Sequence, residues 1–234
     1  MLELLAACTG SQPFGIDLAE WKEIARGGQR VVYEHPKIDS FLIKVTRPES
    51  IKSEGRMFSG PWWKRMRPLG CHTNLIREFT EIIKLQGSDL LASDQYPPVA
   101  RLYGWIPTSI GPGVIVERIA CSDGKIAPTL RELIARNLIS DQHLKALRNF
   151  FDCCRQTNCV LHDIHFANLV YTDCRGGKRL QDQDAEIVCI DGFGDNGLIP
   201  LKLWVRKWNR KQLDRYQKIK ENQLQSKLER PIAA

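Results

Sequence analysis

Short apolar runs bounded by polar and turn-forming residues dominate the first half of the chain, a pattern typical of β-strands. Strands are predicted over residues 30–34 and 41–45. The turn-rich stretch 35–40 lies between them and would join them into a hairpin behind Gly27 and Gly28.

Two further strands are expected at 99–105 and 113–119, around a Pro-Gly turn at 111–113. Residues 47–70 are rich in Pro, Gly and Ser, so we expect an irregular insertion there. Its Trp62-Trp63 pair favours packing within the protein, with contact to a partner or a membrane as the alternative.

A helix is predicted before the second strand pair, because apolar residues recur there at helical spacing. Thr73 or Asn74 is a suitable N-cap, and Gly87 with Ser88 would end the helix. The expected apolar face consists of Leu75, Ile76, Phe79, Ile82 and Ile83.

Helices are expected to dominate the second half, at 130–138 and from the N-cap Ser140 to Cys154. Two short apolar strands are predicted at 168–171 and 186–191. A basic amphipathic helix should follow in the tail, with an apolar stripe made of Leu201, Trp204, Val205 and Trp208.

Strands with one helix thus precede a mainly helical part, which predicts an α+β protein with two lobes. We expect an N-terminal extension over 1–23, a small β-rich lobe over 24–119 and a reduced helical lobe over 120–234. A ligand could bind between two such lobes.

The chain carries 34 Lys and Arg against 27 Asp and Glu, a net charge of +7. This excess fits phosphorylated ligands, an anionic surface or nucleic acid, and the simplest interpretation is a solvated basic C-terminal helix. Nucleic acid is an unlikely partner, because no zinc-finger, RNP or helix-turn-helix pattern is present.

Eight cysteines occur without a C-x-x-C pair, and several fall in apolar periodic segments. We therefore expect free thiols in a reducing compartment. No stretch approaches the roughly 20 apolar residues that span a bilayer, and the start lacks the features of a signal peptide. The expected location is the cytoplasm.

The strongest chemical signal is the stretch 161–170, in which Asp163 is followed five residues later by Asn168 and then by an apolar strand. A second strand ends at Asp191, which is followed by Gly-Phe-Gly. This order is typical of the catalytic loop and metal loop of kinases.

The chemistry of ATP explains these residue types. Its phosphates require a divalent cation, and Mg²⁺ prefers oxygen ligands, which Asp191 and Asn168 can supply. Asp163 can orient an acceptor hydroxyl and take its proton. Gly192 and Gly194 would let the backbone turn sharply beside the metal.

The sequence resembles protein-kinase-like folds and, more closely, the YrbL family of the bacterial PhoP regulatory network. The resemblance extends from about Ile24 to Tyr216. It is carried by 27–36, 43–45, Arg77-Glu78, the catalytic stretch, and 199–201 followed by Trp204 and Trp208.

This resemblance implies a kinase-like fold and ATP binding. Lys44 would contact the α- and β-phosphates and pair with Glu78. Lys44 is the only basic residue in its strand, and Glu78 flanks the apolar face of its helix. The alternative is that Glu78 faces solvent and pairs with Lys84.

Four more positions would contact the nucleotide if the resemblance holds. Gly27 and Gly28 would approach a phosphate, although by themselves they indicate only a turn. Glu117 and Arg118 fall at the expected hinge, where their backbone groups could meet the adenine edge.

Several features depart from protein kinases. Leu161 and His162 replace the usual His-Arg pair, no Ala-Pro-Glu motif follows, and 43 residues remain after Asp191 in a chain of 234. The Asp163-Ile-His165 piece is similar to that of aminoglycoside- and choline-type kinases, which favours a small-molecule or glycolipid hydroxyl acceptor over a protein.

The sequence therefore predicts an ATP- and Mg²⁺-dependent phosphotransferase with a hydroxyl acceptor, acting in envelope stress or PhoP-type regulation. The alternative is a nucleotide-binding pseudokinase that serves as a regulatory interaction module. The roles of His162 and His165 stay open between chemistry and structure.

Overall fold

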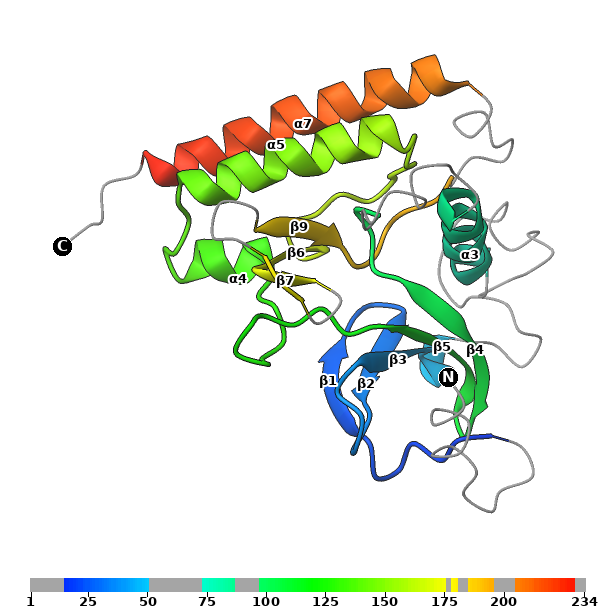
Figure 1. Ribbon diagram of the computed structural model, residues 1–234. Helices are drawn as coiled ribbons and strands as arrows, with labels where there is room; N and C mark the ends of the chain where they lie inside the picture. The colour runs from blue at the N-terminus through cyan, green and yellow to red at the C-terminus, as the bar shows by residue number, and fades with distance from the viewer. Residues whose placement is uncertain are drawn as a thin grey trace. The chain divides into compact units, whose positions relative to one another are not determined.

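The computed structural model describes residues 15–50, 73–86, 97–175, 178–180, 185–195 and 205–229. A five-stranded antiparallel sheet comes first and helices follow, which confirms the predicted α+β class (Figure 1). The chain divides into two compact units. One contains the five-stranded sheet, and the other contains most of the helix at residues 73–86 and every element after residue 118. The lobe limits 24–119 and 120–234 stay a prediction.

The sheet of the first unit has the strand order β1-β2-β3-β5-β4, and every neighbouring pair is antiparallel. Its strands are β1 (Lys22–Arg26), β2 (Arg30–Glu34), β3 (Phe41–Thr46), β4 (Leu102–Thr108) and β5 (Gly111–Glu117). A 3₁₀ turn, η1 (Pro48–Ser50), follows β3.

The hairpin predicted over 30–34 and 41–45 is confirmed, since β2 and β3 pair in this register. Strand β1 was not predicted, because its sequence Lys-Glu-Ile-Ala-Arg has no apolar alternation and lies largely exposed. The turn predicted at 111–113 is wrong: β4 extends to Thr108 and β5 begins at Gly111. The Thr108 hydroxyl donates to the Gly111 carbonyl and closes the tighter turn between them.

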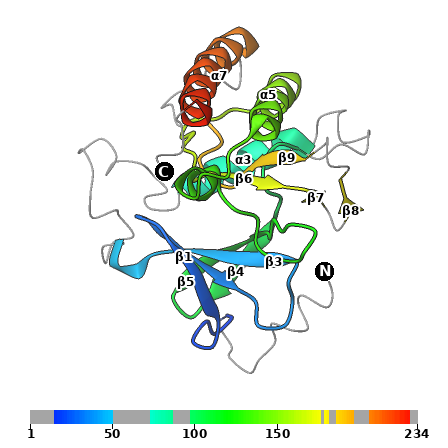
Figure 2. The same cartoon turned by 90° about the vertical axis from the view of Figure 1, so that its left-hand side faces the viewer.

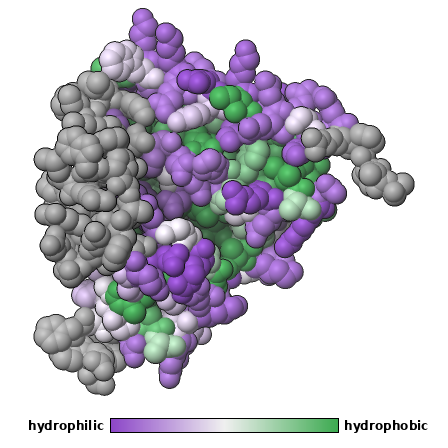
Figure 3. Space-filling model, turned by 180° about the vertical axis from the view of Figure 1, so that it is seen from behind, coloured by the Kyte–Doolittle hydropathy of each residue, from purple (hydrophilic) through white to green (hydrophobic). Residues whose placement is uncertain are grey.

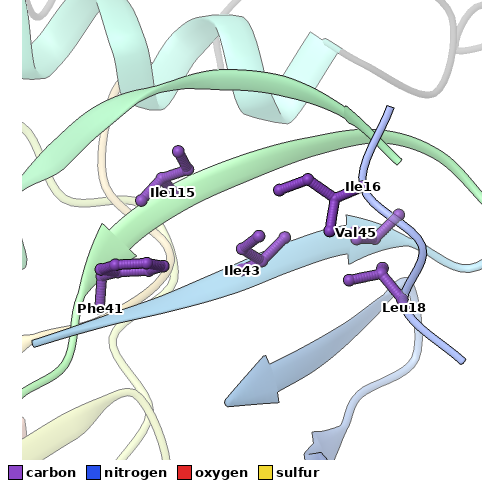
Figure 4. Close-up of a cluster of buried hydrophobic side chains, with 6 residues drawn as sticks. All are labelled: Ile16, Leu18, Phe41, Ile43, Val45 and Ile115. Atoms are coloured by element: carbon purple, nitrogen blue, oxygen red, sulfur yellow. The ribbon is translucent and has the colours of Figure 1, made fainter. Parts of the chain in front are cut away.

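The core of the first unit gathers on one face of β3 (Figure 4). Phe41, Ile43 and Val45 alternate along this strand and point to the same side. Ile115 of β5 joins them, and the segment with Ile16 and Leu18 covers them. Because successive side chains of a strand point to opposite faces, Lys44 belongs to the other face of β3.

Helix α3 (Thr73–Gln86) forms close to where it was predicted, and Leu75 and Ile82 of the expected apolar face are buried. Ile76 and Ile83, expected on that face, are 40% and 64% exposed. Two carboxylates take part in the buried face instead, those of Glu78 and Glu81. Apolar spacing alone therefore predicted only part of the buried face, because hydrophobic periodicity does not detect buried glutamates.

Helices and small sheets build the second unit (Figures 1 and 2). The helices are α4 (Leu130–Ala135), α5 (Asp141–Gln156) and α7 (Arg206–Leu228), and α7 packs along α5. The strand pairs are β6 (Leu169–Thr172) with β9 (Glu186–Cys189) and β7 (Cys174–Arg175) with β8 (Lys178–Arg179). The Ser140 N-cap of α5 is confirmed: its backbone N–H donates to His143 Nδ1 at 3.1 Å.

Helix α4 is shorter than predicted. Asn137 adopts a left-handed backbone with φ of 54°, and the Leu138 N–H donates back to the Leu133 carbonyl. This is the usual way for a helix to end before a chain reversal, and asparagine tolerates the conformation.

The apolar stripe predicted for the tail is wrong at Trp208, the one member of it that lies within a described helix. Helix α7 begins at Arg206, and Trp208 is 54% exposed. Its buried residues are Asn209, Leu213 and Leu224. Asn209 Nδ2 donates to the Cys159 carbonyl at 3.0 Å, so a polar contact sets the buried face. Leu201 and Trp204 lie outside the described residues, as do Trp62, Trp63 and Gly87.

The surface seen in Figure 3 is mostly hydrophilic, with smaller hydrophobic areas between the polar residues. Among the helices of the described ranges, none combines the length and the apolar character needed to cross a membrane. None of the six cysteines in these ranges takes part in a disulfide, as expected for that part of the chain.

The buried Glu81 should carry much of the attachment of α3 to the second unit. Its carboxylate accepts the Val160 N–H at 2.8 Å and pairs with Lys84, and burial raises its pKa against the opposing effect of Lys84. Glu81→Ala leaves both donors without their acceptor and should lower the free energy of unfolding by about 2 kcal/mol. Denaturant unfolding at pH 7 measures the change.

Glu81→Gln is the matched control, because the amide oxygen can still accept the Val160 N–H while the buried charge is removed. It should cost clearly less stability than the alanine variant. Equal losses in the two variants would mean that the hydrogen bond to Val160 contributes nothing measurable.

Candidate active site

The catalytic loop, residues 161–168, lies between α5 and β6 and is anchored by apolar side chains. Leu161 and Ile164 are buried, while the Asp163 side chain is 52% exposed. The Asn168 side-chain amide donates to the Asp163 carbonyl at 3.0 Å, and the Asn168 N–H donates to the His165 carbonyl at 2.8 Å. These bonds close the loop and leave the Asp163 carboxylate facing solvent.

The metal loop, residues 191–194, follows β9 and lies directly against the catalytic loop. The Gly192 carbonyl accepts both the His162 N–H at 2.9 Å and the Asp163 N–H at 3.1 Å. The Gly194 N–H donates to the Val160 carbonyl at 2.7 Å. The structure therefore brings together the loops that carry Asp163, Asn168 and Asp191, as the sequence predicted.

Pairing of two strands explains why these loops meet. Strands β6 and β9 are antiparallel, with Leu169 opposite Cys189. The Ile190 N–H donates to the Asn168 carbonyl at 2.8 Å. Asn168 precedes one strand and Asp191 follows the other, so antiparallel pairing places them at the same end.

Two glycines of the metal loop have the backbone conformation expected of them. Gly192 has φ of +83° and Gly194 has φ of +92°. A Cβ atom on Gly192 would lie 2.6 Å from the Asp163 carbonyl oxygen, and one on Gly194 would lie 2.7 Å from that of Arg77. Only glycine fits both the conformation and the close approach.

Asn168 and Asp191 suit a magnesium ion that is shared with phosphate oxygens. Because the Asn168 amide nitrogen binds the Asp163 carbonyl, its amide oxygen is turned away from that carbonyl. No cluster of three or more His, Cys, Asp or Glu side chains able to hold a metal occurs in the described residues. Mg²⁺ bound with a nucleotide usually takes one or two protein ligands together with waters and phosphate oxygens, a role that a carboxylate and an amide oxygen can fill.

The two histidines of the loop have different surroundings. His162 Nδ1 is 3.0 Å from the Gly194 carbonyl, and burial lowers the pKa of His162. His165 Nε2 is 2.8 Å from Asp163 Oδ1, and its side chain is 63% exposed. His162 thus joins the two loops, and His165 contacts the candidate base directly.

Lys44 lies in the first unit, in the middle of β3. It is opposite Val32 of β2 and Val114 of β5, and only 8% of it is exposed. A buried ammonium group requires an anionic partner or ligand. Its contact with nucleotide phosphates stays a prediction.

Glu78 lies on α3 and is 3% exposed. The alternative in which Glu78 faces solvent and pairs with Lys84 is wrong, because Lys84 pairs with Glu81 and donates to the Asn158 carbonyl at 2.8 Å. The pairing of Glu78 with Lys44 stays a prediction.

Gly27 and Gly28 occupy the three-residue loop between β1 and β2. The Gly27 N–H donates to the Arg30 carbonyl at 2.8 Å, which closes the loop. No atom lies within 4 Å of the position that a Gly28 Cβ would take, so the backbone there is open to approach. Phosphate contact at this loop stays a prediction.

Glu117 is the last residue of β5 and Arg118 follows it as the last residue of the first unit along the chain. Their backbone N–H groups donate to the Arg101 carbonyl at 2.8 Å and the Ser40 carbonyl at 3.1 Å. The Arg118 side chain pairs with Glu34. An adenine contact by these two residues stays a prediction, and it would have to come from a carbonyl oxygen.

Comparison with known protein families decides the relationship of the chain. Residues 16–223 match the family described as PhoP regulatory network protein YrbL. The chain belongs to the YrbL family. The match confirms the resemblance drawn from the motifs and extends it at both ends.

The other comparisons of this YrbL-family protein show distant similarity or none. Comparison with curated proteins gives no match. A solved structure described as Rad53 1–466 in complex with AMP-PNP is 12% identical, with a TM-score of 0.40. The match covers 73% of the YrbL-family chain and 36% of the other chain, so our chain spans about a third of that structure. At this identity and TM-score the likeness supports no conclusion about this chain.

Sequence reasoning missed the part that α7 plays at the site. Gln212 donates to the Leu161 carbonyl at 3.5 Å, and the Tyr216 hydroxyl donates to the His162 carbonyl at 3.4 Å. The pKa of Lys220 is lowered by burial and raised in part by the charge of Asp163. The spacing of these residues along one face of a helix was visible, but nothing in the sequence pointed that face at the catalytic loop.

Gly192→Ala should disrupt the contact between the two loops, because a methyl group would strike the Asp163 carbonyl in a backbone conformation that alanine avoids. We expect a loss of at least about 2 kcal/mol in the free energy of unfolding. Gly28→Ala is the matched control, since its methyl group meets open space. Denaturant unfolding of both variants measures the difference. Equal free energies of unfolding in the two variants would contradict the prediction.

Stability should fall in acid partly through His162. Burial lowers its native pKa below the ordinary 6.5, so the unfolded chain takes up the proton first. The stability that the neutral His162 contributes is fully present above pH 6.5, and it is lost as the pH falls through the pKa of His162 in the folded protein. His162→Gln should therefore lose less stability than the wild type between pH 7.5 and 5.5, measured by denaturant unfolding. Identical losses would exclude this role.

Proposed function

We propose that this YrbL-family protein is an ATP-dependent phosphotransferase that transfers the γ-phosphate to a hydroxyl group. The observation that carries the proposal is the contact between the catalytic and metal loops. The Gly192 carbonyl accepts two backbone N–H groups, those of His162 and Asp163, and so holds Asp163 beside the loop that begins with Asp191. Asn168 is fixed between them by its bond to the Asp163 carbonyl.

Each of these side chains has a distinct chemical task. The exposed Asp163 carboxylate accepts the proton of the acceptor hydroxyl while its oxygen forms the new bond to the γ-phosphorus. The bond from that phosphorus to the β,γ-bridging oxygen breaks, and ADP leaves with the electron pair. Asp191 and Asn168 would hold Mg²⁺, which supplies positive charge to the phosphate oxygens.

The first unit would supply the remaining nucleotide contacts. Lys44 and Glu78 are both buried, which supports a functional role for each, because a buried charge needs a counter-charge. Lys44 would bind the α- and β-phosphates and Glu78 would orient it. Gly27 and Gly28 would approach the phosphates, and Glu117 with Arg118 would border the adenine.

The family description connects the protein with the PhoP regulatory network. A phosphotransferase in such a network would act on a small molecule, a glycolipid or a protein. The Asp163-Ile-His165 motif favours the first two.

A nucleotide-binding pseudokinase is the second candidate. It is favoured by the contact of His165 Nε2 with Asp163 Oδ1, which occupies the proposed base, and by Leu161 in place of histidine. Such a protein would bind MgATP and change its interactions without turning ATP over.

The test is binding and turnover of ATP by the purified protein. The wild type should be stabilised by MgATP in thermal-shift measurements and should release ADP in the presence of an acceptor. Asp163→Asn should retain nucleotide binding but lose turnover by about 10²–10⁴-fold, the range of a general base. Asp191→Asn should weaken MgATP binding as well.

Asp123→Asn serves as the matched control, because Asp123 is an exposed carboxylate that pairs with Lys125 away from the two loops. It should behave as the wild type. Stabilisation of the wild type by MgATP without any turnover would favour the pseudokinase. Equal turnover in the wild type, Asp163→Asn and Asp191→Asn would defeat the phosphotransferase.

A further inference from the structure

A groove of about 540 Å³ opens beside the catalytic loop, within the second unit. Its walls come from three elements that are distant in sequence: Arg131 of α4, His165 and Phe166 of the loop, and Lys220, Gln223 and Lys227 of α7. A groove of this volume suits a small molecule or the headgroup of a lipid.

Hydrogen bonds hold these walls together. The Arg131 N–H donates to the Phe166 carbonyl at 3.1 Å, which joins α4 to the catalytic loop. Gln212 and Tyr216 of α7 contact the carbonyls of Leu161 and His162 on the same loop. Lys220 follows Tyr216 by one helical turn and therefore lies on the same side of α7.

The groove is strongly positive. Arg131, Lys220 and Lys227 supply three basic side chains, and none of the described residues that line the groove is Asp or Glu. A partly enclosed site with charge of one sign concentrates ligands of the opposite sign. A cationic acceptor, such as an amino sugar or choline, would be repelled.

The groove also comes close to the proposed base, through a side chain that lines it. His165 lines it and has its Nε2 2.8 Å from Asp163 Oδ1. Lys220 Nζ lies 4.8 Å from the centre of the Phe166 ring, so an apolar face borders the positive charge. A ligand that placed an anionic group against the lysines could present a hydroxyl toward Asp163.

We propose that this groove binds the phosphoryl acceptor and that the acceptor is a hydroxyl compound with an anionic group, such as a sugar phosphate or a glycerophosphate. The proposal rests on the proposed phosphotransferase function and names its substrate class. The anionic group would bind Lys220, Lys227 and Arg131. The acceptor hydroxyl would lose its proton to Asp163 as its oxygen takes the γ-phosphate and ADP leaves.

The first experiment measures binding without nucleotide, by calorimetric titration of the full chain at low salt. The anionic probes are glucose 6-phosphate and glycerol 3-phosphate, and the others are glucose and glucosamine. Vesicles of phosphatidylcholine with phosphatidylglycerol, assayed by co-sedimentation, separate a lipid source of the same headgroup from a free one. At least one anionic probe should bind, and glucose and glucosamine should not.

Lys220→Gln with Lys227→Gln should weaken this binding by about tenfold or more, because charge-assisted contacts are lost. Lys218→Gln is the matched control, since Lys218 is an exposed lysine of the same helix that does not line the groove. Thermal melting of each free variant verifies its fold. Added salt should weaken binding to the wild type.

Several outcomes would overturn the inference. These are no binding of any anionic probe, equal binding of glucose, or equal affinity in the double variant and the control. An equal loss of MgADP affinity in the double variant would instead make the groove part of the nucleotide site.

A second measurement separates this inference from the proposed function. ATP turnover is followed with the anionic probe that binds and with its neutral counterpart. If the anionic probe binds in a charge-dependent way but no turnover occurs, the groove is still a binding site for anionic compounds, and the phosphotransferase proposal is defeated. Turnover that is indifferent to acceptor charge keeps the phosphotransferase and defeats the anionic acceptor.

Discussion

The Gly192 carbonyl, which accepts the N–H groups of both His162 and Asp163, is the contact on which the candidate site depends. It joins two loops that are almost thirty residues apart in the chain. A single backbone hydrogen bond contributes only about 1 kcal/mol to stability, so its importance is geometric. It requires a left-handed backbone and a close approach at position 192, and glycine meets both requirements.

Helix α7 supports the same loop from the other side. Asn209, Gln212 and Tyr216 each contact a carbonyl of residues 159–162, and Lys220 continues this face toward the groove. The helix is therefore part of the candidate site as well as a basic surface. Its positive charge, which by composition fits many partners, is partly concentrated where an acceptor would bind.

Prediction from sequence succeeded where local pattern and local geometry coincide. The β2–β3 hairpin, the Ser140 cap and the glycines of the metal loop all depend on neighbours in the chain. It failed where a distant partner decides burial. Glu78 and Glu81 replace isoleucines on the buried face of α3, and Asn209 replaces tryptophan on that of α7. Hydrophobic periodicity cannot detect a buried polar group whose partner lies far away in sequence.

The sequence alone determined the family, the α+β class and the residue types that suit a metal-bound triphosphate, because motif spacing and glycine conformation are local properties. Tertiary structure alone decided that His162 bridges the two loops, that His165 touches the Asp163 carboxylate and that Lys220 lies over the Phe166 ring. These contacts depend on how strands β6 and β9 pair and how α7 packs on α5. Such pairings between distant segments leave no periodic trace in a single sequence.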